Sequence, residues 1–408
     1  MAAHGDDPSS TAELREPTTP AGRALLSLIG NHLAAIRECA RENDRAGAFP
    51  FDVFTGFRKD GVLGATVPRE LGGLGVTSLY DVCLALLTVA EADASTALAL
   101  HMQLSRGLTL TYEWQHGDAA RQQLAERLLR GMGSGAAVVC TTVKDAGAGP
   151  PTSLTPDPVG GWRLTGRKTL ASMAPIATHF VVSARTEEPG RPPAQAAAVV
   201  SGQTAGLTVL DNWDGLGMRA SGSVDIVLED CHVPEGDVFL RGAVDAHDDA
   251  QLAGRTVSSV TMLGIYTGIA QAARDYTVST LARRGRTPAG AKALVAETEA
   301  RLYALRTTVG AALGTADYLS YEYAGDPAVR GRRMMFAFQR AKLMVNKLAP
   351  DIVADCLTVI GGASYAGANP LSRLYRDVRA GSFMHPFTYP DAVEYLSTEA
   401  VETGRYDG

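Results

Sequence analysis

Several side chains that can carry out proton chemistry are spread along the 408-residue sequence. His385 lies in the segment SFMHPFTYP, and an imidazole with a reference pKa of about 6.5 can accept or donate a proton near neutral pH. A packing role in this segment explains the residue equally well. His101, within LALHMQLS, is more typical of a hydrogen-bonded core histidine than of a catalyst.

Cysteine usage and charge exclude several classes of function. The 5 cysteines are scattered and none forms a C-x-x-C pair, which disfavours a disulfide framework and predicts no metal site. A formal charge of -6 without a basic cluster argues against a nucleic-acid or anionic-membrane partner. No apolar run approaches twenty residues and the first residues lack a secretory signal pattern, so we expect a cytoplasmic protein.

Three regions with different periodicity must position these side chains. Apolar residues recur at helical spacing over 21–135, and short Val- and Thr-rich runs separated by turn residues predict strands over 136–235. Long helical patterns return within 236–408 and predict a buried helical bundle. Residues 1–20 are expected to form a disordered tail. The fold class is therefore α+β.

Local sequence identifies the family that this order resembles. GVLGATVPRELGGLGV (61–76), GLGMRASGSVDIVLEDCHVP (215–234) and IGGASYAGANPLSRLYRDVR (360–379) resemble three signature regions of the acyl-CoA dehydrogenase superfamily, in the same order. The resemblance implies an N-terminal helical domain, a middle β-barrel or sandwich domain and a C-terminal four-helix bundle. It also implies a flavin between the β domain and the C-terminal helices, in a homotetramer where a neighbouring subunit completes the site.

The resemblance assigns one part of the flavin site to the β region. The family's flavin loop corresponds to TTVKDAGAG (141–149), which places Thr142 and Gly147 at the cofactor. Its flavin-facing strand corresponds to TLASMA (169–174), where Ser172 keeps a hydroxyl and Leu170 replaces the family's tryptophan. As isolated residues, Thr142 and Ser172 would more often be ordinary strand residues.

The resemblance assigns the other part to the C-terminal region. Gly361 and Gly362 keep the glycines of a family loop that approaches the flavin, although its glutamine is absent. The arginine-containing turn that meets the flavin diphosphate is altered here, and Arg283 and Arg284 are candidates to replace it. A solvated basic turn explains these arginines about as well. FAD is the expected cofactor, with FMN possible.

The carboxylates that a dehydrogenase needs are missing. In the family, a glutamate removes the substrate α-proton while hydride passes to the flavin, and it occupies one of two positions. Those positions are His385 and Gly254 in this sequence. Loss of both resembles the oxygenase branch of the superfamily, where reduced flavin and O2 form a C4a-hydroperoxide that attacks the substrate. In that chemistry His385 is the candidate catalytic base.

Within this branch the sequence is most similar to the nitrososynthases. The segments SRGLTLTYEWQHG (105–117), GRKTLASMAPIATHFVVSART (166–186) and VLDNWDGLGMRASGSVDIV (209–227) carry this finer resemblance. It implies N-oxidation of a TDP-linked amino sugar in antibiotic biosynthesis, with reduced flavin delivered by a separate flavin reductase. Four aromatic residues are candidates to stack on the thymine or line the pocket, although such residues are more often core: Trp114, Trp213, Phe383 and Tyr389.

Three other functions remain open from the sequence. The first is an acyl-CoA or acyl-carrier dehydrogenase with a non-standard base, and the second is a two-component flavin monooxygenase acting on an aromatic or other small molecule. The third is a flavin-free scaffold, because the diphosphate turn and the glutamine are altered. Oxygen dependence separates the oxygenases from the dehydrogenase, and flavin titration tests the scaffold.

Overall fold

The computed structural model describes residues 13–147, 149–244 and 248–401. Six helices form the N-terminal region, and helices α4 and α5 are almost entirely buried at its centre. Side-chain oxygens of Ser78, Asp93 and Asp118 cap the starts of α4, α5 and α6 by accepting backbone N–H bonds. The helices are α1 (Pro20–Gly30), α2 (Leu33–Ala46), α3 (Phe51–Lys59), α4 (Leu79–Ala92), α5 (Ala94–His116) and α6 (Ala119–Gly133).

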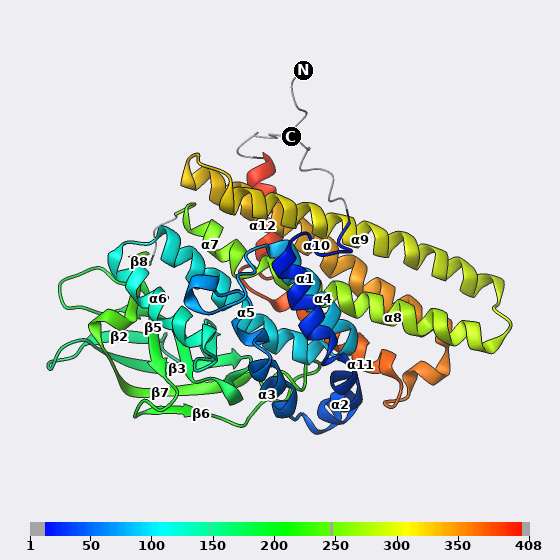
Figure 1. The fold of residues 1–408 in the computed structure, drawn as a ribbon, viewed down its shortest axis with the longest axis horizontal. Coiled ribbons are helices and arrows are strands. Elements are labelled where there is room, and N and C mark those ends of the chain that lie inside the picture. Colours follow the sequence, from blue (N-terminus) through cyan, green and yellow to red (C-terminus); the bar gives the residue numbers. More distant parts are fainter. Residues whose placement is uncertain (1–12, 148, 245–247, 402–408) are drawn as a thin grey trace, which may run out of the picture.

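The middle region is one hydrogen-bonded sheet of eight strands, seen on the left of Figure 1. Its strand order is β6-β7-β3-β2-β4-β5-β8, and β1 pairs parallel to β4. The pairing of β3 with β7 is shifted between Lys168 and Ala171, at the end of β3. The strands are β1 (Val139–Thr142), β2 (Ser153–Pro156), β3 (Trp162–Ala171), β4 (His179–Thr186), β5 (Ala194–Ser201), β6 (Leu207–Val209), β7 (Val224–Val233) and β8 (Val238–Ala243).

The C-terminal region is a bundle in which α10 packs against α7, α8, α9 and α12. Helices α8, α9 and α10 extend away from the sheet, and the turn between α8 and α9 lies at the opposite end of the molecule from the strands (Figure 1). Helix α8 also packs on α4, which joins the two helical regions in one core. The helices are α7 (Gln251–Val257), α8 (Leu263–Arg284), α9 (Ala289–Tyr321), α10 (Pro327–Ile360), α11 (Pro370–Asp377) and α12 (Tyr389–Val401).

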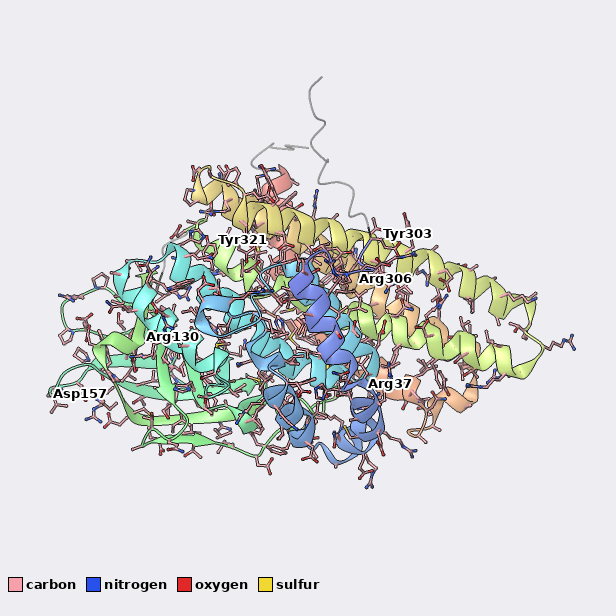
Figure 2. The ribbon with its side chains drawn as sticks, viewed as in Figure 1. Arg37, Arg130, Asp157, Tyr303, Arg306 and Tyr321 are labelled. Atoms are coloured by element: carbon pink, nitrogen blue, oxygen red, sulfur yellow. The ribbon has the colours of Figure 1, made fainter. Side chains whose placement is uncertain are left out.

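The predicted order of helices, sheet and helices is confirmed, but two boundaries differ. Residues 1–12 of the expected tail lie outside the described residues, whereas residues from 13 onward pack on α4 and α9. Leu14 is buried, and its N–H donates to the carbonyl of Arg306 on α9, a residue labelled in Figure 2. Thr18 and Thr19 donate to the Asp81 carboxylate. Acidic Asp81 gives this polar segment a buried acceptor, which local composition does not reveal.

The second difference is strand β8, which falls within the range 236–408 expected to be helical. It follows the 3-10 turn Glu235–Asp237 and pairs antiparallel with β5, so the sheet continues to Ala243. Six residues are too few for a clear alternating pattern, and the strand depends on its partner. In the described part of the chain, no helix is long and apolar enough to span a membrane, and no group of side chains suits a metal ion.

Candidate active site

The loop after β1 carries the first predicted flavin residues. Thr142 is 1% exposed and its hydroxyl has no hydrogen-bond partner within the described chain. A buried hydroxyl without a partner is unfavourable, so this atom is suited to a ligand placed against the loop. Gly147 is exposed, and a Cβ there would meet no atom within 4 Å, so no contact within the chain requires its glycine.

A buried lysine holds this loop against the sheet. Lys168 on β3 is 1% exposed, and its Nζ lies 2.7 Å from Asp145 Oδ1 and 3.1 Å from the Val143 carbonyl. The Thr152 hydroxyl donates to the same carboxylate at 2.6 Å. Burial lowers the pKa of Lys168, and Asp145 opposes that shift. The loop is therefore fixed by charged hydrogen bonds before any ligand binds.

The end of β3 brings Leu170 and Ser172 to the same side of the molecule as this loop. Leu170 has a φ of 60° and is 51% exposed, an unusual conformation for an apolar side chain at the end of a strand. Ser172 is buried, and its Oγ lies 2.7 Å from Ser223 Oγ, which lies 2.6 Å from Ser221 Oγ. These three serine hydroxyls have three protons, but the two hydrogen bonds between them use only two. One proton is left for an outside acceptor.

His385 lies in the segment between the 3-10 turn Val378–Phe383 and α12. Its ring is exposed, yet surrounding protein partly desolvates it and lowers its pKa, and nearby cations on three elements add to the effect. These cations are Lys342 on α10, Lys144 after β1 and Arg255 on α7. Asp391 on α12 is the carboxylate that interacts with the imidazole. The lowered pKa favours the neutral imidazole, which can accept a proton.

Lys342 fixes the segment that carries His385. Its side chain is 2% exposed, and its ammonium donates to the backbone carbonyls of Met384 and Phe387, on either side of the histidine. Desolvation lowers the pKa of Lys342 to about 8, and Asp391 opposes that shift. Asp391 in turn accepts hydrogen bonds from the Thr388 N–H at 2.9 Å and the Thr388 hydroxyl at 2.6 Å.

The two positions that the sequence resemblance assigns to a dehydrogenase glutamate are linked through Arg255. Gly254 is on α7, next to Arg255, whose charge acts on His385. A Cβ at Gly254 would meet no atom within 4 Å, so the fold leaves room for a side chain there. Steric exclusion therefore does not explain the absence of a glutamate at Gly254.

The four predicted aromatic residues have different environments. Phe383 is 74% exposed and lies two residues from His385, and Tyr389 begins α12 four residues after it. Trp213 donates its indole N–H to the Met218 carbonyl at 2.9 Å, a bond within its own loop. Trp114 on α5 packs against the smaller core cluster. Phe383 and Tyr389 thus lie near the histidine, whereas Trp213 and Trp114 have structural contacts.

Arg283, Arg284, Gly361 and Gly362 lie together, but far from the strands. Arg284 Nη2 donates to the Ile360 carbonyl at 3.1 Å, and Arg283 donates to the Thr280 hydroxyl at 3.1 Å. Gly361 has a φ of 78° where α10 ends, which favours glycine. A Cβ on either glycine would meet no atom within 4 Å, so no contact within one chain requires both. The structure therefore places the two predicted parts of the flavin site at opposite ends of the molecule (Figure 1).

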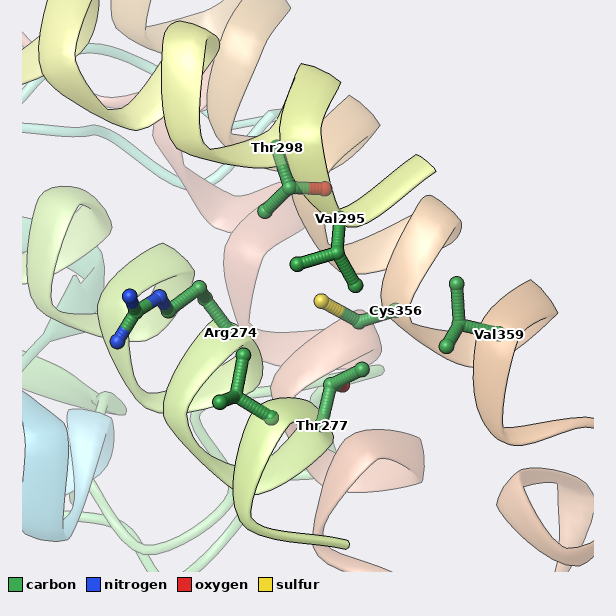
Figure 3. Close-up of a pocket in the computed structure, with 7 residues that line it drawn as sticks. Arg274, Thr277, Val295, Thr298, Cys356 and Val359 are labelled. Carbon is green, nitrogen blue, oxygen red and sulfur yellow. The ribbon is translucent and has the colours of Figure 1, made fainter. Parts of the chain in front are cut away.

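Two other cavities do not contain the predicted site residues. An open groove near Arg219 and Arg376 is formed by an interdomain network, in which Arg376 pairs with Asp44 and Arg219 donates to the Asp44 carbonyl at 2.9 Å. Figure 3 shows a small pocket between α8, α9 and α10, around Cys356. Burial raises the pKa of the Cys356 thiol to about 11, so it is not a reactive nucleophile.

Comparison with known proteins follows the same three regions. Models of the acyl-CoA dehydrogenase N-terminal, middle and C-terminal domains match residues 33–135, 141–231 and 260–388. L-evernosamine nitrososynthase from Micromonospora sp. is 58% identical over 97% of this chain and 94% of its own length. The amino sugar nitrososynthase DnmZ from Streptomyces peucetius is 57% identical over 95% of each chain. The chain belongs to the amino sugar nitrososynthase family, within the acyl-CoA dehydrogenase superfamily.

Solved structures agree with this assignment. The X-ray structure of KijD3 in complex with FMN and dTDP-3-amino-2,3,6-trideoxy-4-keto-3-methyl-D-glucose matches with a TM-score of 0.95, at 59% identity over 98% of each chain. The nitrososynthase from Micromonospora carbonacea var. africana matches with a TM-score of 0.93, at 58% identity over 96% of this chain and 99% of that one. The similarity to nitrososynthases that three sequence segments indicated is confirmed over nearly the whole chain.

Buried cations are the main feature of this nitrososynthase that sequence reasoning missed. Lys168, Lys342 and Arg106 are each less than a tenth exposed. A single Lys or Arg inside an otherwise apolar pattern was the available signal, since such residues are seldom buried without partners. His101 is buried as expected for a core histidine, and desolvation lowers its pKa to about 4.

Proposed function

We propose that this nitrososynthase is a flavin-dependent N-oxygenase that oxidises the amine of a TDP-linked amino sugar in antibiotic biosynthesis. One observation carries the proposal. Both dehydrogenase glutamate positions are occupied by His385 and Gly254 in a chain that otherwise keeps the fold and is 57% to 59% identical to nitrososynthases. Without either glutamate the chain lacks the base for α-proton abstraction, while N-oxidation needs no such step.

His385 acts on the substrate amine in this proposal. An amine attacks as a nucleophile only when neutral, so its ammonium form must lose a proton first. The lowered pKa of His385 favours its neutral form, whose free ring nitrogen can accept that proton. The charges of Lys144 and Arg255 also disfavour an ammonium ion placed beside them. Phe383 and Tyr389 contribute apolar surface next to the histidine.

The flavin fits the β-domain residues. The unpartnered Thr142 hydroxyl and the spare proton of the Ser172 chain offer hydrogen bonds to ring heteroatoms, and exposed Leu170 offers apolar contact to the ring face. When bound in reduced form, the flavin supplies the electrons that activate O2. FAD and FMN both remain compatible with these contacts, which involve the ring alone. The chain's own task is to hold the ring and exclude water.

A homotetramer is part of the proposal, because the two predicted parts of the flavin site are distant within one chain. Arg283, Arg284, Gly361 and Gly362 lie at the far end of the bundle, where both glycines leave space for an approaching molecule. Placed against the β domain of a neighbouring copy, this end would complete the site. A separate reductase that delivers reduced flavin completes the proposed system in the cytoplasm.

An oxygen-dependence assay tests the proposal. Enzyme, flavin reductase, NADH and a TDP-amino sugar are incubated in air and under anaerobic conditions, and products are followed by mass spectrometry. We expect conversion only in air, with a mass gain equal to added oxygen. Reduction of the bound flavin by an acyl-CoA under anaerobic conditions would instead identify a dehydrogenase.

A further inference from the structure

A chain of three serine hydroxyls ends at Ser172, one of the predicted flavin residues. Ser172 directly follows β3, and Ser221 and Ser223 lie just before β7. Ser172 Oγ lies 2.7 Å from Ser223 Oγ, which lies 2.6 Å from Ser221 Oγ. All three residues are less than a tenth exposed, and Ser221 is fully buried. The hydroxyl chain is therefore closed at its inner end, Ser221.

The backbone of three strands holds this hydroxyl chain in place. Strands β3 and β7 pair antiparallel up to the serines. The Met173 N–H donates to the Ser221 carbonyl at 3.0 Å, which ties the end of β3 to the start of β7. The Cys140 thiol on β1 donates to the Ser172 carbonyl at 3.2 Å. The fold itself therefore sets the spacing of the hydroxyls, without help from a bound ligand.

The closed inner end gives the hydroxyl chain a direction. Ser223 is the only hydrogen-bond partner of the Ser221 hydroxyl among the described residues. If Ser172 donated inward, Ser223 would donate to Ser221, and the buried Ser221 proton would lack an acceptor, which is unfavourable. If Ser221 donates to Ser223 and Ser223 donates to Ser172, both inner protons have acceptors. The Ser172 proton is then the one that points out of the chain.

We propose that Ser221 and Ser223 are positioning residues that hold the Ser172 hydroxyl as a hydrogen-bond donor toward an acceptor atom of the bound flavin. This inference rests on the proposed function, which places the flavin against Ser172. A lone serine hydroxyl can rotate to donate or accept, whereas this hydroxyl is directed by its neighbours. A hydroxyl that accepts a hydrogen bond also becomes a stronger donor, so the two inner serines strengthen the outer bond. Ring carbonyl oxygens and unprotonated ring nitrogens are suitable acceptors.

A double-mutant cycle on FMN affinity tests this inference, with binding followed by flavin fluorescence. Ser172→Ala should bind FMN about 5-fold more weakly, the usual effect of losing one neutral hydrogen bond. Ser223→Ala should bind FMN about 3-fold more weakly, and the visible spectrum of bound FMN should shift toward that of Ser172→Ala. Because Ser223 acts through Ser172, the double variant should bind FMN no more weakly than Ser172→Ala alone.

Two further variants separate this role from a structural one. Ser320 on α9 is 3% exposed, and its hydroxyl has no partner in the described part of the chain. Ser320→Ala is therefore the matched control for loss of a buried hydroxyl and should bind FMN like wild type. Ser221→Ala leaves no hydroxyl proton of the chain without an acceptor. Its FMN affinity should lie between those of wild type and Ser223→Ala, because Ser221 acts only through Ser223.

The inference is overturned if Ser223→Ala keeps the wild-type FMN affinity and spectrum. It is also overturned if Ser223→Ala weakens FMN binding equally with and without the Ser172 hydroxyl, since the effect would then be structural. Oxidation of the amino sugar by wild type is measured in parallel. Its failure would count against the proposed N-oxygenase, whereas FMN binding that depends on Ser223 through Ser172 would still stand.

Discussion

At the scale of single residues, His385 is the side chain on which the proposed chemistry depends. Lys342, Lys144, Arg255 and partial desolvation lower its pKa, and Asp391 is the opposing carboxylate. A lowered pKa means that the ring loses its proton at a lower pH than an ordinary histidine. Activity that needs the neutral ring is therefore present at pH 7 and is lost only as pH falls below the lowered pKa.

Replacing His385 with Gln tests this role. We expect kcat/KM for the amino sugar to fall by about 100-fold near pH 7, within the usual range for general acid–base catalysis. The remaining activity should no longer decline on the acid side of the pH profile. His232→Gln is the control, because His232 pairs with Asp157, which lies at the end of the molecule opposite the long C-terminal helices (Figure 2). If His385→Gln kept the wild-type kcat/KM and pH profile, the histidine would have only a packing role.

At the scale of elements, the segment between residues 383 and 388 is held to α10 by one buried ammonium. Lys342→Met would leave the carbonyls of Met384 and Phe387 without their donor. We expect a loss of about 2 kcal/mol in the free energy of unfolding and a fall in kcat of about 10-fold. Amide hydrogen exchange of residues 383–388 should accelerate.

The control for this change lies one and a half turns along the same helix. Lys347 is exposed, and Lys347→Met should leave stability, turnover and exchange at wild-type values. Exchange rates in Lys342→Met that match those of Lys347→Met would show that the ammonium does not fix the segment. A lower free energy of unfolding in Lys342→Met without faster amide exchange of residues 383–388 would also contradict the prediction.

The elements also show what the sequence can and cannot predict. Periodicity predicted the order of helices and strands, because α4, α5 and the long C-terminal helices carry strong apolar patterns. Motif spacing assigned His385 and Gly254 to the two positions where a dehydrogenase carries its glutamate. Strand β8 was missed because it depends on pairing with β5, and the burial of Arg106 and Lys342 was not predicted because it depends on contacts with distant segments.

At the scale of the whole molecule, a buried aspartate joins the β domain to the C-terminal region. Asp377 at the end of α11 is fully buried and accepts the Met218 N–H at 2.6 Å, while its other oxygen has no partner in the described chain. Burial raises its pKa to about 7, with Asp93 adding to the shift and Arg373 opposing it. The folded chain therefore binds this proton more tightly than the unfolded chain does.

The consequence for stability has a definite sign. As pH rises from about 4 to 7, the unfolded chain releases the Asp377 proton first, so this residue lowers the free energy of unfolding over that range. Asp377→Asn removes the effect and should be more stable than wild type at pH 8, by on the order of 2–4 kcal/mol. At pH 5 the gain in stability should be smaller, about half of that at pH 8, because the pH has risen only about one unit above the pKa of the unfolded chain. Urea unfolding at both pH values checks this, and an equal pH dependence in the two proteins would contradict it.

The oxygen in the product tests the central claim most directly. The enzyme is supplied with reduced flavin, a TDP-amino sugar and isotopically heavy O2, and the sugar product is analysed by mass spectrometry. Because His385 and Gly254 replace the dehydrogenase glutamates, we predict that the heavy isotope appears on the sugar nitrogen and that no product forms without O2. Product that carries oxygen from water, or an acyl-CoA that reduces the bound flavin without O2, would contradict the account.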